Sequence, residues 1–160
     1  MIPTALAVHT IVLGLAAATN AAIAWFAYRR RKIPGSVPFG ALTACLSVWS
    51  LTYGVGLHAG ESGLRILLLR VQWTAIPFIT VSLFLFAATY TGVDEVLDWR
   101  SVAAILAIPA LTVVATWTNP LHRLFWTREN VQVVDALALM DPTFGPLFWV
   151  YTIYGYTLVA

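Results

Sequence analysis

Charged residues are scarce in this chain: of 160 residues, nine are Lys or Arg and seven are Asp or Glu, which is 10% in all. A typical soluble domain has about 25% charged residues. At 60% hydrophobic content, a chain of this length has more apolar side chain than one small globule can bury. The same composition excludes a disordered chain. A net charge of only +2, with no basic patch among aromatics, argues against a nucleic-acid partner. An integral membrane protein remains.

Residues that carry chemistry are equally few. The single cysteine, Cys45, cannot form an internal disulfide, and the only lysine, Lys32, lies at the end of an apolar run. The three histidines (His9, His58 and His122) lack the spacing of metal ligands. No nucleophile–base pair and no phosphate-binding glycine loop is recognisable. We therefore expect no catalytic residues, no metal and no cofactor in this chain.

Long apolar runs dominate what is present. A helix needs about 20 apolar residues to cross a bilayer core. We expect spans at about residues 4–28, 37–58, 64–91 and 101–118, and a fifth, incomplete run at 145–160. The predicted fold class is an all-α, polytopic transmembrane helical bundle of about five spans. Residues 1–160 form a single membrane region, which we expect to be a fragment whose last helix is incomplete.

The basic residues predict the orientation of the bundle. Residues 29–32 (Arg-Arg-Arg-Lys) follow the first span, and the positive-inside rule places them in the cytoplasm. The N-terminus and the long loop at 119–144 are then outside. Within that loop, residues 131–133 and 137–139 alternate loosely around Asp135, which predicts a short β-hairpin.

A row of small residues marks one face of the second span. Small side chains let helices approach closely, and their hydroxyl groups can hydrogen-bond across the contact. We interpret this row as a helix-packing face and not as a ligand groove. Its members, at spacings of three and four, are Gly40, Thr43, Ser47, Ser50 and Gly54.

Arg70 is the most informative charge, because it shares a helical face with Trp73 and Pro77. In one interpretation it faces an outward-open cavity and holds an anionic group. In the other, which the nearby Arg65 favours, its side chain reaches the lipid headgroups. A pocket would lie in the outer half, between the third span and the 119–144 loop. The candidate ligand-binding residues are Arg70, Trp73, Asn119, His122, Trp126 and Asp141.

All seven acidic residues fall in predicted loops. Ion-coupled transporters usually place a carboxylate inside the membrane, and these spans have none. The residues themselves therefore indicate a multi-span membrane bundle with an ordered outer loop.

Several short motifs, in their order and spacing, resemble a known family. They are residues 29–35, Trp49-Ser50, Arg70-Val71-Gln72-Trp73 with Pro77, residues 84–92, residues 117–122 with Trp126, and residues 144–150 with Tyr154. Together they resemble the N-terminal seven-transmembrane region of prokaryotic sensor histidine kinases.

The resemblance implies seven helices with the N-terminus outside, in a multi-pass protein of a prokaryotic cell membrane. It also implies a signal-input role in a two-component system, so a sensory module is the first hypothesis for function. A component of a membrane transporter or channel is the alternative. The stimulus, a small molecule or a physical change in the bilayer, is not identified by the motifs. The implied partners are the lipid bilayer, PAS and kinase domains of the same parent chain, and a second copy in a homodimer. Kinase activity would belong to the parent, since no kinase domain lies within these residues.

Overall fold

The computed structural model describes residues 4–59, 62–92, 98–134 and 137–160, and from residue 129 to residue 141 it describes the backbone only. Five longer helices, one short helix and one pair of strands make up the described chain. They are α1 (Thr4–Arg29), α2 (Ser36–Gly56), α3 (Ser62–Thr91), α4 (Trp99–Trp117), α5 (Asn119–His122), β1 (Trp126–Val134), β2 (Leu137–Phe144) and α6 (Pro146–Val159).

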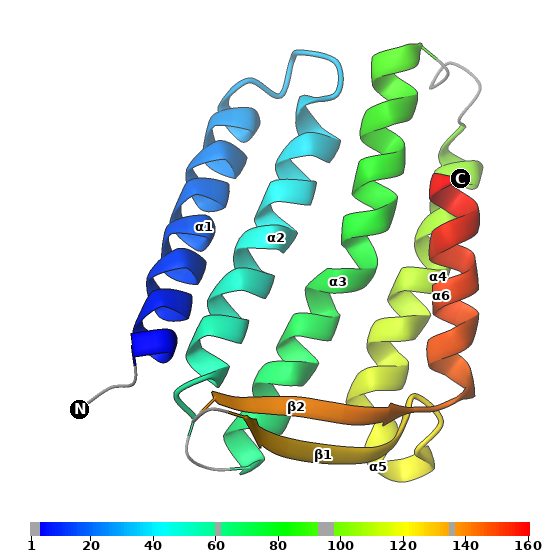
Figure 1. Ribbon diagram of the computed structural model, residues 1–160. Coiled ribbons are helices and arrows are strands. Elements are labelled where there is room, and N and C mark those ends of the chain that lie inside the picture. The colour runs from blue at the N-terminus through cyan, green and yellow to red at the C-terminus, as the bar shows by residue number, and fades with distance from the viewer. Residues whose placement is uncertain (1–3, 60–61, 93–97, 135–136) are drawn as a thin grey trace.

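The longer helices run alternately up and down through one bundle (Figure 1). The start of α1, the strands and α5 lie at one end, which we call the hairpin end. The loop between α1 and α2, with Arg29, Arg30, Arg31 and Lys32, lies at the other, which we call the arginine end. The predicted all-α bundle is confirmed, and each of the five longer helices begins and ends within two residues of its predicted span.

Within the described residues, four helices are long and apolar enough to cross a membrane: Leu6–Arg29, Ser36–Gly56, Gly63–Thr91 and Trp99–Trp117. The 14 residues of α6 are about 21 Å of helix at 1.5 Å per residue, which is shorter than a bilayer core. Only 6% of the most apolar part of α1 is buried, so most of its surface is open to surrounding lipid.

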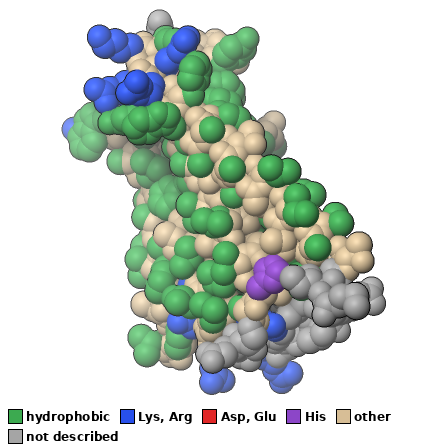
Figure 2. Space-filling model, turned by 90° about the vertical axis from the view of Figure 1, so that its left-hand side faces the viewer, with side chains coloured by type: hydrophobic (Ala, Val, Ile, Leu, Met, Phe, Trp, Pro, Cys, Tyr) green, Lys and Arg blue, Asp and Glu red, His purple; other side chains and the backbone are tan. Residues whose placement is uncertain are grey.

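Large apolar side chains cover the surface between the two ends of the bundle. On the face shown in Figure 2, the Lys and Arg side chains gather toward the ends and hydrophobic side chains lie between them. At the arginine end, the guanidinium of Arg30 lies 4.5 Å from the centre of the Phe26 ring, and that of Arg31 lies 5.2 Å from the Tyr28 ring. Amphipathic aromatic rings with arginines are typical of membrane interfaces. The surface is that of a membrane protein.

The β-hairpin predicted in the long loop is present and longer than expected. β1 and β2 are antiparallel, with Trp126 opposite Phe144 at the open end and Val134 opposite Leu137 near the tip, and the register is irregular between Trp126 and Arg128. The tip itself, residues 135–136, lies outside the described residues. The strands extend the predicted segments because the loop packs onto the helices through Trp126, which is 1% exposed. The sequence analysis did not predict the four-residue helix α5.

The small residues of α2 lie against α1. The Ser47 hydroxyl donates a hydrogen bond of 2.8 Å to the Ala17 carbonyl oxygen of α1. A Cβ at Gly40 would lie 3.2 Å from the Cβ of Ala27, so a side chain at this position would push the helices apart. Gly54 is similarly close to Leu13 of α1, and Thr43 and Ser50 are each only 4% exposed. Close approach of α1 and α2 therefore depends on these small side chains.

Asp98 is the N-cap residue of α4 and lies just before its first helical residue. Its carboxylate accepts hydrogen bonds from the backbone N–H of Ser101, at 2.8 Å, and from the Ser101 hydroxyl, at 2.6 Å. Both bonds stabilise the ionised carboxylate, so the pKa of Asp98 is lowered from its ordinary value. The Ser101 hydroxyl has the larger effect and the backbone N–H the smaller. An N-cap of this kind explains why the helix begins at Trp99.

Two prolines lie within helices, Pro77 in α3 and Pro109 in α4, and both are fully buried. Proline has no N–H, so Pro109 leaves the carbonyl oxygen of Ile105 without its usual helical donor. The hydroxyl of Tyr154 in α6 donates a hydrogen bond of 2.7 Å to that oxygen. A side chain of α6 therefore replaces a backbone donor of α4 and joins the two helices.

Candidate ligand site at the hairpin end

Aromatic rings form the core of the hairpin end. Trp73 of α3 packs edge-on against the rings of Phe125 and Trp126, with centroids 4.9 and 6.0 Å away. It also packs against Phe148 and Tyr151 of α6, at 5.7 and 5.8 Å. Phe125 and Trp126 are 0% and 1% exposed. This cluster joins the loop to α3 and α6, because the ring of Trp73 in α3 contacts rings of the loop and rings of α6.

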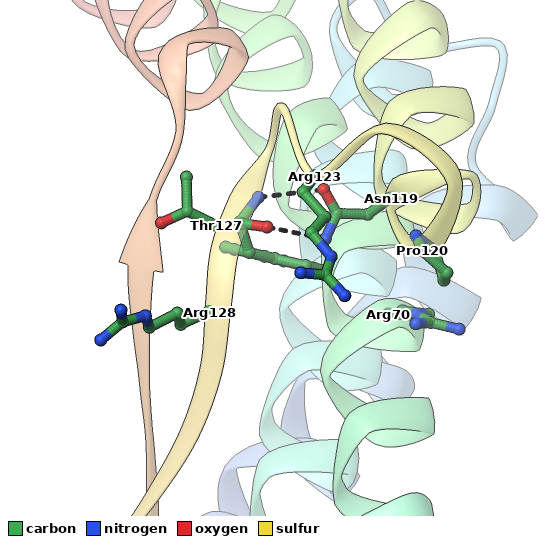
Figure 3. Close-up of a pocket in the computed structure, with 7 residues that line it drawn as sticks. Arg70, Asn119, Pro120, Arg123, Thr127 and Arg128 are labelled. Carbon is green, nitrogen blue, oxygen red and sulfur yellow. Dashed lines mark hydrogen bonds between the residues drawn. The ribbon is translucent and has the colours of Figure 1, made fainter.

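The loop between α4 and β1 is shaped by Asn119. Its side-chain oxygen accepts hydrogen bonds from the backbone N–H groups of Phe125 and Trp126, at 3.0 and 3.1 Å. Its amide nitrogen donates to the carbonyl oxygen of Trp126 at 3.0 Å (Figure 3). Asn119 is 2% exposed. One buried amide therefore satisfies three backbone groups that would otherwise be buried without partners.

The turn around α5 contains a backbone conformation that residues other than glycine rarely adopt. Pro120 occupies the first turn of α5, where a missing N–H costs nothing. The helix ends after one turn at Arg123, whose φ of 52° is left-handed. The Arg123 N–H donates to the Asn119 carbonyl oxygen at 2.7 Å, which closes the turn. The conformation holds the Arg123 side chain beside β1.

A cavity of about 430 Å³, which we call the arginine cavity, opens next to this turn (Figure 3). Three separate elements bring an arginine to it: α3, the turn after α5, and β1. In the close-up, Arg123 lies between Arg70 and β1, while the guanidinium of Arg128 points away from both. The lining residues are Arg70, Asn119, Pro120, Arg123, Trp126, Thr127 and Arg128.

The cavity wall offers positive charge and hydrogen-bond donors. A guanidinium keeps its charge at all ordinary pH values and has donors but no acceptor. The Thr127 hydroxyl donates to the Thr143 carbonyl oxygen of β2 at 3.1 Å. Of the side chains that the structure describes, the one carboxylate is that of Asp98, at the start of α4 and far from the hairpin end. Such a wall suits an anionic group.

The chain as a whole matches one known family. The profile of the family described as the N-terminal 7TM region of histidine kinase covers residues 12–160. The chain belongs to this family. No curated protein and no solved structure matches it.

The match to this histidine kinase family includes the hairpin as well as the helices, so the cavity lies within the matched region. The family is named for the N-terminal 7TM region of a histidine kinase and not for the catalytic part of the kinase. Among the described residues, no group of three His, Cys, Asp or Glu side chains could hold a metal ion.

The structure distributes the six predicted ligand residues over several places. Arg70, Asn119 and Trp126 line the arginine cavity. Trp73 lies in the aromatic core and lines a separate groove of about 210 Å³ between α2, α3 and β2. The side chain of Asp141 lies outside the described residues, although its backbone pairs with Asn130.

His122 serves the turn and does not line the arginine cavity. Its Nδ1 accepts a hydrogen bond of 2.9 Å from the Leu124 N–H. Its Nε2 lies 3.1 Å from the Thr118 hydroxyl oxygen, and that hydroxyl donates to the Val114 carbonyl oxygen. These partners assign the proton to Nε2, which donates to Thr118.

Arg123 and Arg128 are not among the ligand residues predicted from the sequence. Both lie in the long loop that was expected to face outside, and a pair of basic residues in the same loop as Asn119 and Trp126 was the available signal. Their positions on the cavity that Arg70 also lines depend on the turn at Arg123 and on the hairpin register, which no local pattern predicts.

Proposed function

We propose that the chain is the signal-input region of a two-component sensor histidine kinase in a prokaryotic cell membrane. In this proposal the hairpin end faces outside and receives an external or membrane stimulus. The observation that supports it most is the position of Trp126, which lines the arginine cavity on one side and packs against Trp73 on the other. A ligand in contact with Trp126 would therefore be one ring away from Trp73 of α3, which in turn packs against Phe148 and Tyr151 of α6.

Relay to the inside would follow α6, which leaves the hairpin directly. The Gly145 N–H donates to the Phe125 carbonyl oxygen at 2.8 Å, and the Leu147 N–H donates to the Leu124 carbonyl oxygen at 3.1 Å. The first turn of α6 is thus bound to the segment that carries Trp126. A stimulus that favours one position of this segment would shift the population of α6 positions. Cytoplasmic PAS and kinase domains of the parent chain, in a homodimer, would read that shift.

Autophosphorylation of the full-length parent kinase in lipid vesicles tests this proposal. Trp73→Phe shortens the ring that joins the loop to α3 and α6, and we expect it to change the basal rate by about threefold or more, which corresponds to at least about 0.6 kcal/mol in activation free energy. The matched control is Trp49→Phe in α2, because Trp49 is 38% exposed and its ring stacks on Tyr53 of the same helix. The control is expected to retain the wild-type rate.

Equal rates for wild type and both variants would contradict the relay through Trp73. A transporter or channel makes a different prediction, namely that vesicles with the protein pass a solute or ion at a rate above that of empty vesicles. Such a flux, together with an unresponsive kinase, would favour that alternative.

A further inference from the structure

We infer that the groove between α2, α3 and β2 binds a small, uncharged aromatic molecule that carries a hydrogen-bonding group, with Gln72 as its polar partner. We call this site the Gln72 groove. It shares no lining residue with the arginine cavity. Binding is a property of the groove alone, and only its use as a stimulus rests on the proposed function.

The first argument is that Gln72 is a buried amide without a partner. Its side chain is 8% exposed and lies within the candidate span Gly63–Thr91, where lipid offers no hydrogen bond. Within the described part of the chain it makes no hydrogen bond, whereas the amides of Asn20 and Asn119 donate to carbonyl oxygens at 2.8 and 3.0 Å. An unpaired buried amide costs free energy, and a ligand that pairs with it recovers that cost.

The second argument is the aromatic character of the groove wall. Each of the three elements brings an aromatic ring to it: Tyr53 from α2, Trp73 from α3 and Phe144 from β2. Buried leucines, Leu57 and Leu69, add apolar surface between the rings. Aromatic rings attract one another in stacked or edge-on arrangements beyond the effect of apolar burial. A flat aromatic ligand therefore gains more here than an alkyl group of the same size.

The size of the groove limits the ligand to one or two rings. Its volume is about 210 Å³. A cavity of roughly 150 Å³ is enough to hold benzene, and pockets for drug-sized ligands begin at roughly 300 Å³. A single ring or a fused pair of rings fits between these limits, and a peptide or a whole phospholipid does not.

The charges at the groove disfavour a cation. Arg65 also lines it, and its Nε donates a hydrogen bond to the Ala59 carbonyl oxygen. A fixed guanidinium repels a cationic ligand. The buried polar partner, Gln72, is neutral and offers both a donor and an acceptor, so it pairs with an uncharged N–H, hydroxyl or carbonyl group.

Indole and indene are the probes that test this inference. The two molecules have the same fused-ring shape, but only indole has an N–H group, which can donate to the Gln72 carbonyl oxygen. Equilibrium dialysis of the chain in maltoside micelles, against protein-free micelles at the same detergent concentration, subtracts partition into the detergent. We expect saturable binding of indole by the wild-type chain.

Gln72→Leu removes the amide and keeps a side chain of similar size. We expect the ratio of indole affinity to indene affinity to fall about fivefold in this variant, as for the loss of one hydrogen bond. The comparison of ratios cancels the difference in water solubility between the probes. Asn20→Leu in α1 is the matched control, because the Asn20 amide bonds to Ala16 of its own helix. The control should keep the wild-type ratio.

Gly56→Leu tests the position of the site. Gly56 lines the groove, and a Cβ there would lie 3.8 Å from the Leu68 side chain, which is an ordinary contact. The added side chain is expected to occupy the groove and to weaken the binding of both probes about tenfold or more. Gly14→Leu makes the same change in α1, where nothing lies within 4 Å of a Cβ, and should bind as wild type does.

Three results would overturn the inference. Neither probe binds beyond its partition into micelles, which would leave water as the occupant; Gln72→Leu keeps the wild-type ratio; or Gly14→Leu weakens binding as much as Gly56→Leu. None of these measurements involves the kinase reaction, so failure of the groove and failure of the relay through Trp73 are distinguishable.

Discussion

Among the described glycines, Gly145, between β2 and α6, has the least room for a side chain. A Cβ at this position would overlap the carbonyl group of Leu124, because the backbone segments 124–125 and 145–147 lie against each other. We predict that Gly145→Ala lowers the free energy of unfolding by about 2 kcal/mol, as for other substitutions that overfill a packed site. Denaturant titration in micelles measures the change.

Gly63 in α3 is the matched control for that prediction. Nothing lies within 4 Å of a Cβ built there, so Gly63→Ala should be neutral or stabilise the helix by at most about 1 kcal/mol. Equal effects at the two positions would show that the contact with Leu124 does not limit position 145.

Tyr154 is the second residue whose chemistry is specific. Its hydroxyl serves the Ile105 carbonyl oxygen that Pro109 leaves without a donor. We predict that Tyr154→Phe costs about 1 kcal/mol of stability. Tyr156→Phe should cost nothing measurable, because Tyr156 is 77% exposed.

A double-mutant cycle with Pro109→Ala tests the reason for this bond. Alanine restores the helical N–H at 109, so the Ile105 carbonyl oxygen gains a donor and the effect of Tyr154→Phe should shrink. The same cost in both backgrounds would mean that Tyr154 does not compensate for the proline.

At the scale of elements, the loop from α5 to β1 depends on a single side chain. Asn119→Ala removes the three hydrogen bonds that the buried amide makes to Phe125 and Trp126. We predict that amide hydrogen exchange at residues 125 and 126 accelerates about 100-fold, which corresponds to about 2.7 kcal/mol of local stability. Exchange in the middle of α1 and α2 should not change.

Asn119→Asp is the conservative companion. The carboxylate still accepts from the two N–H groups but no longer donates to the Trp126 carbonyl oxygen, so an intermediate acceleration is expected. An exchange rate that rises equally throughout the molecule in Asn119→Ala would contradict a local role.

The same elements show how far the sequence can be interpreted. Long apolar runs determine the spans because the bilayer requires a minimum length, and α1 to α4 accordingly lie where they were expected. The hairpin was recognisable from alternation in its centre, but its full length depends on the packing of Trp126 against Trp73. The one-turn helix α5 is too short to have a periodic pattern.

The candidate site was predictable only in part, because it too depends on packing between segments that are distant in the sequence. Arg70, Asn119 and Trp126 line one cavity, as residues on neighbouring elements often do. Trp73 points into the aromatic core and His122 into its own turn, and those directions depend on contacts between distant segments. Arg123 lines the cavity with a left-handed φ that arginine rarely adopts, so no sequence pattern predicts its position there.

For the whole molecule, the charge distribution predicts which end faces the cytoplasm. In a Cys45→Ala background, we expect Leu121→Cys to react with a membrane-impermeant maleimide in intact cells, because Leu121 is 86% exposed at the hairpin end. Lys32→Cys at the arginine end should react only after lysis. The reverse pattern would place the arginine cavity inside the cell and remove its access to external ligands.

The hydrogen bond between Tyr154 and Ile105 also limits how the bundle can move. Among the described residues of α4, Pro109 is the only proline, so Ile105 has the one carbonyl oxygen that a proline leaves open. Sliding α6 by a helical turn would take the Tyr154 hydroxyl about 5.4 Å away, to carbonyl oxygens that already have backbone donors. Piston motion of α6 is therefore opposed, while tilting or rotation about this point keeps the bond. The hydrogen bond between Tyr154 and Ile105 is therefore a fixed point about which α6 can tilt or rotate against α4.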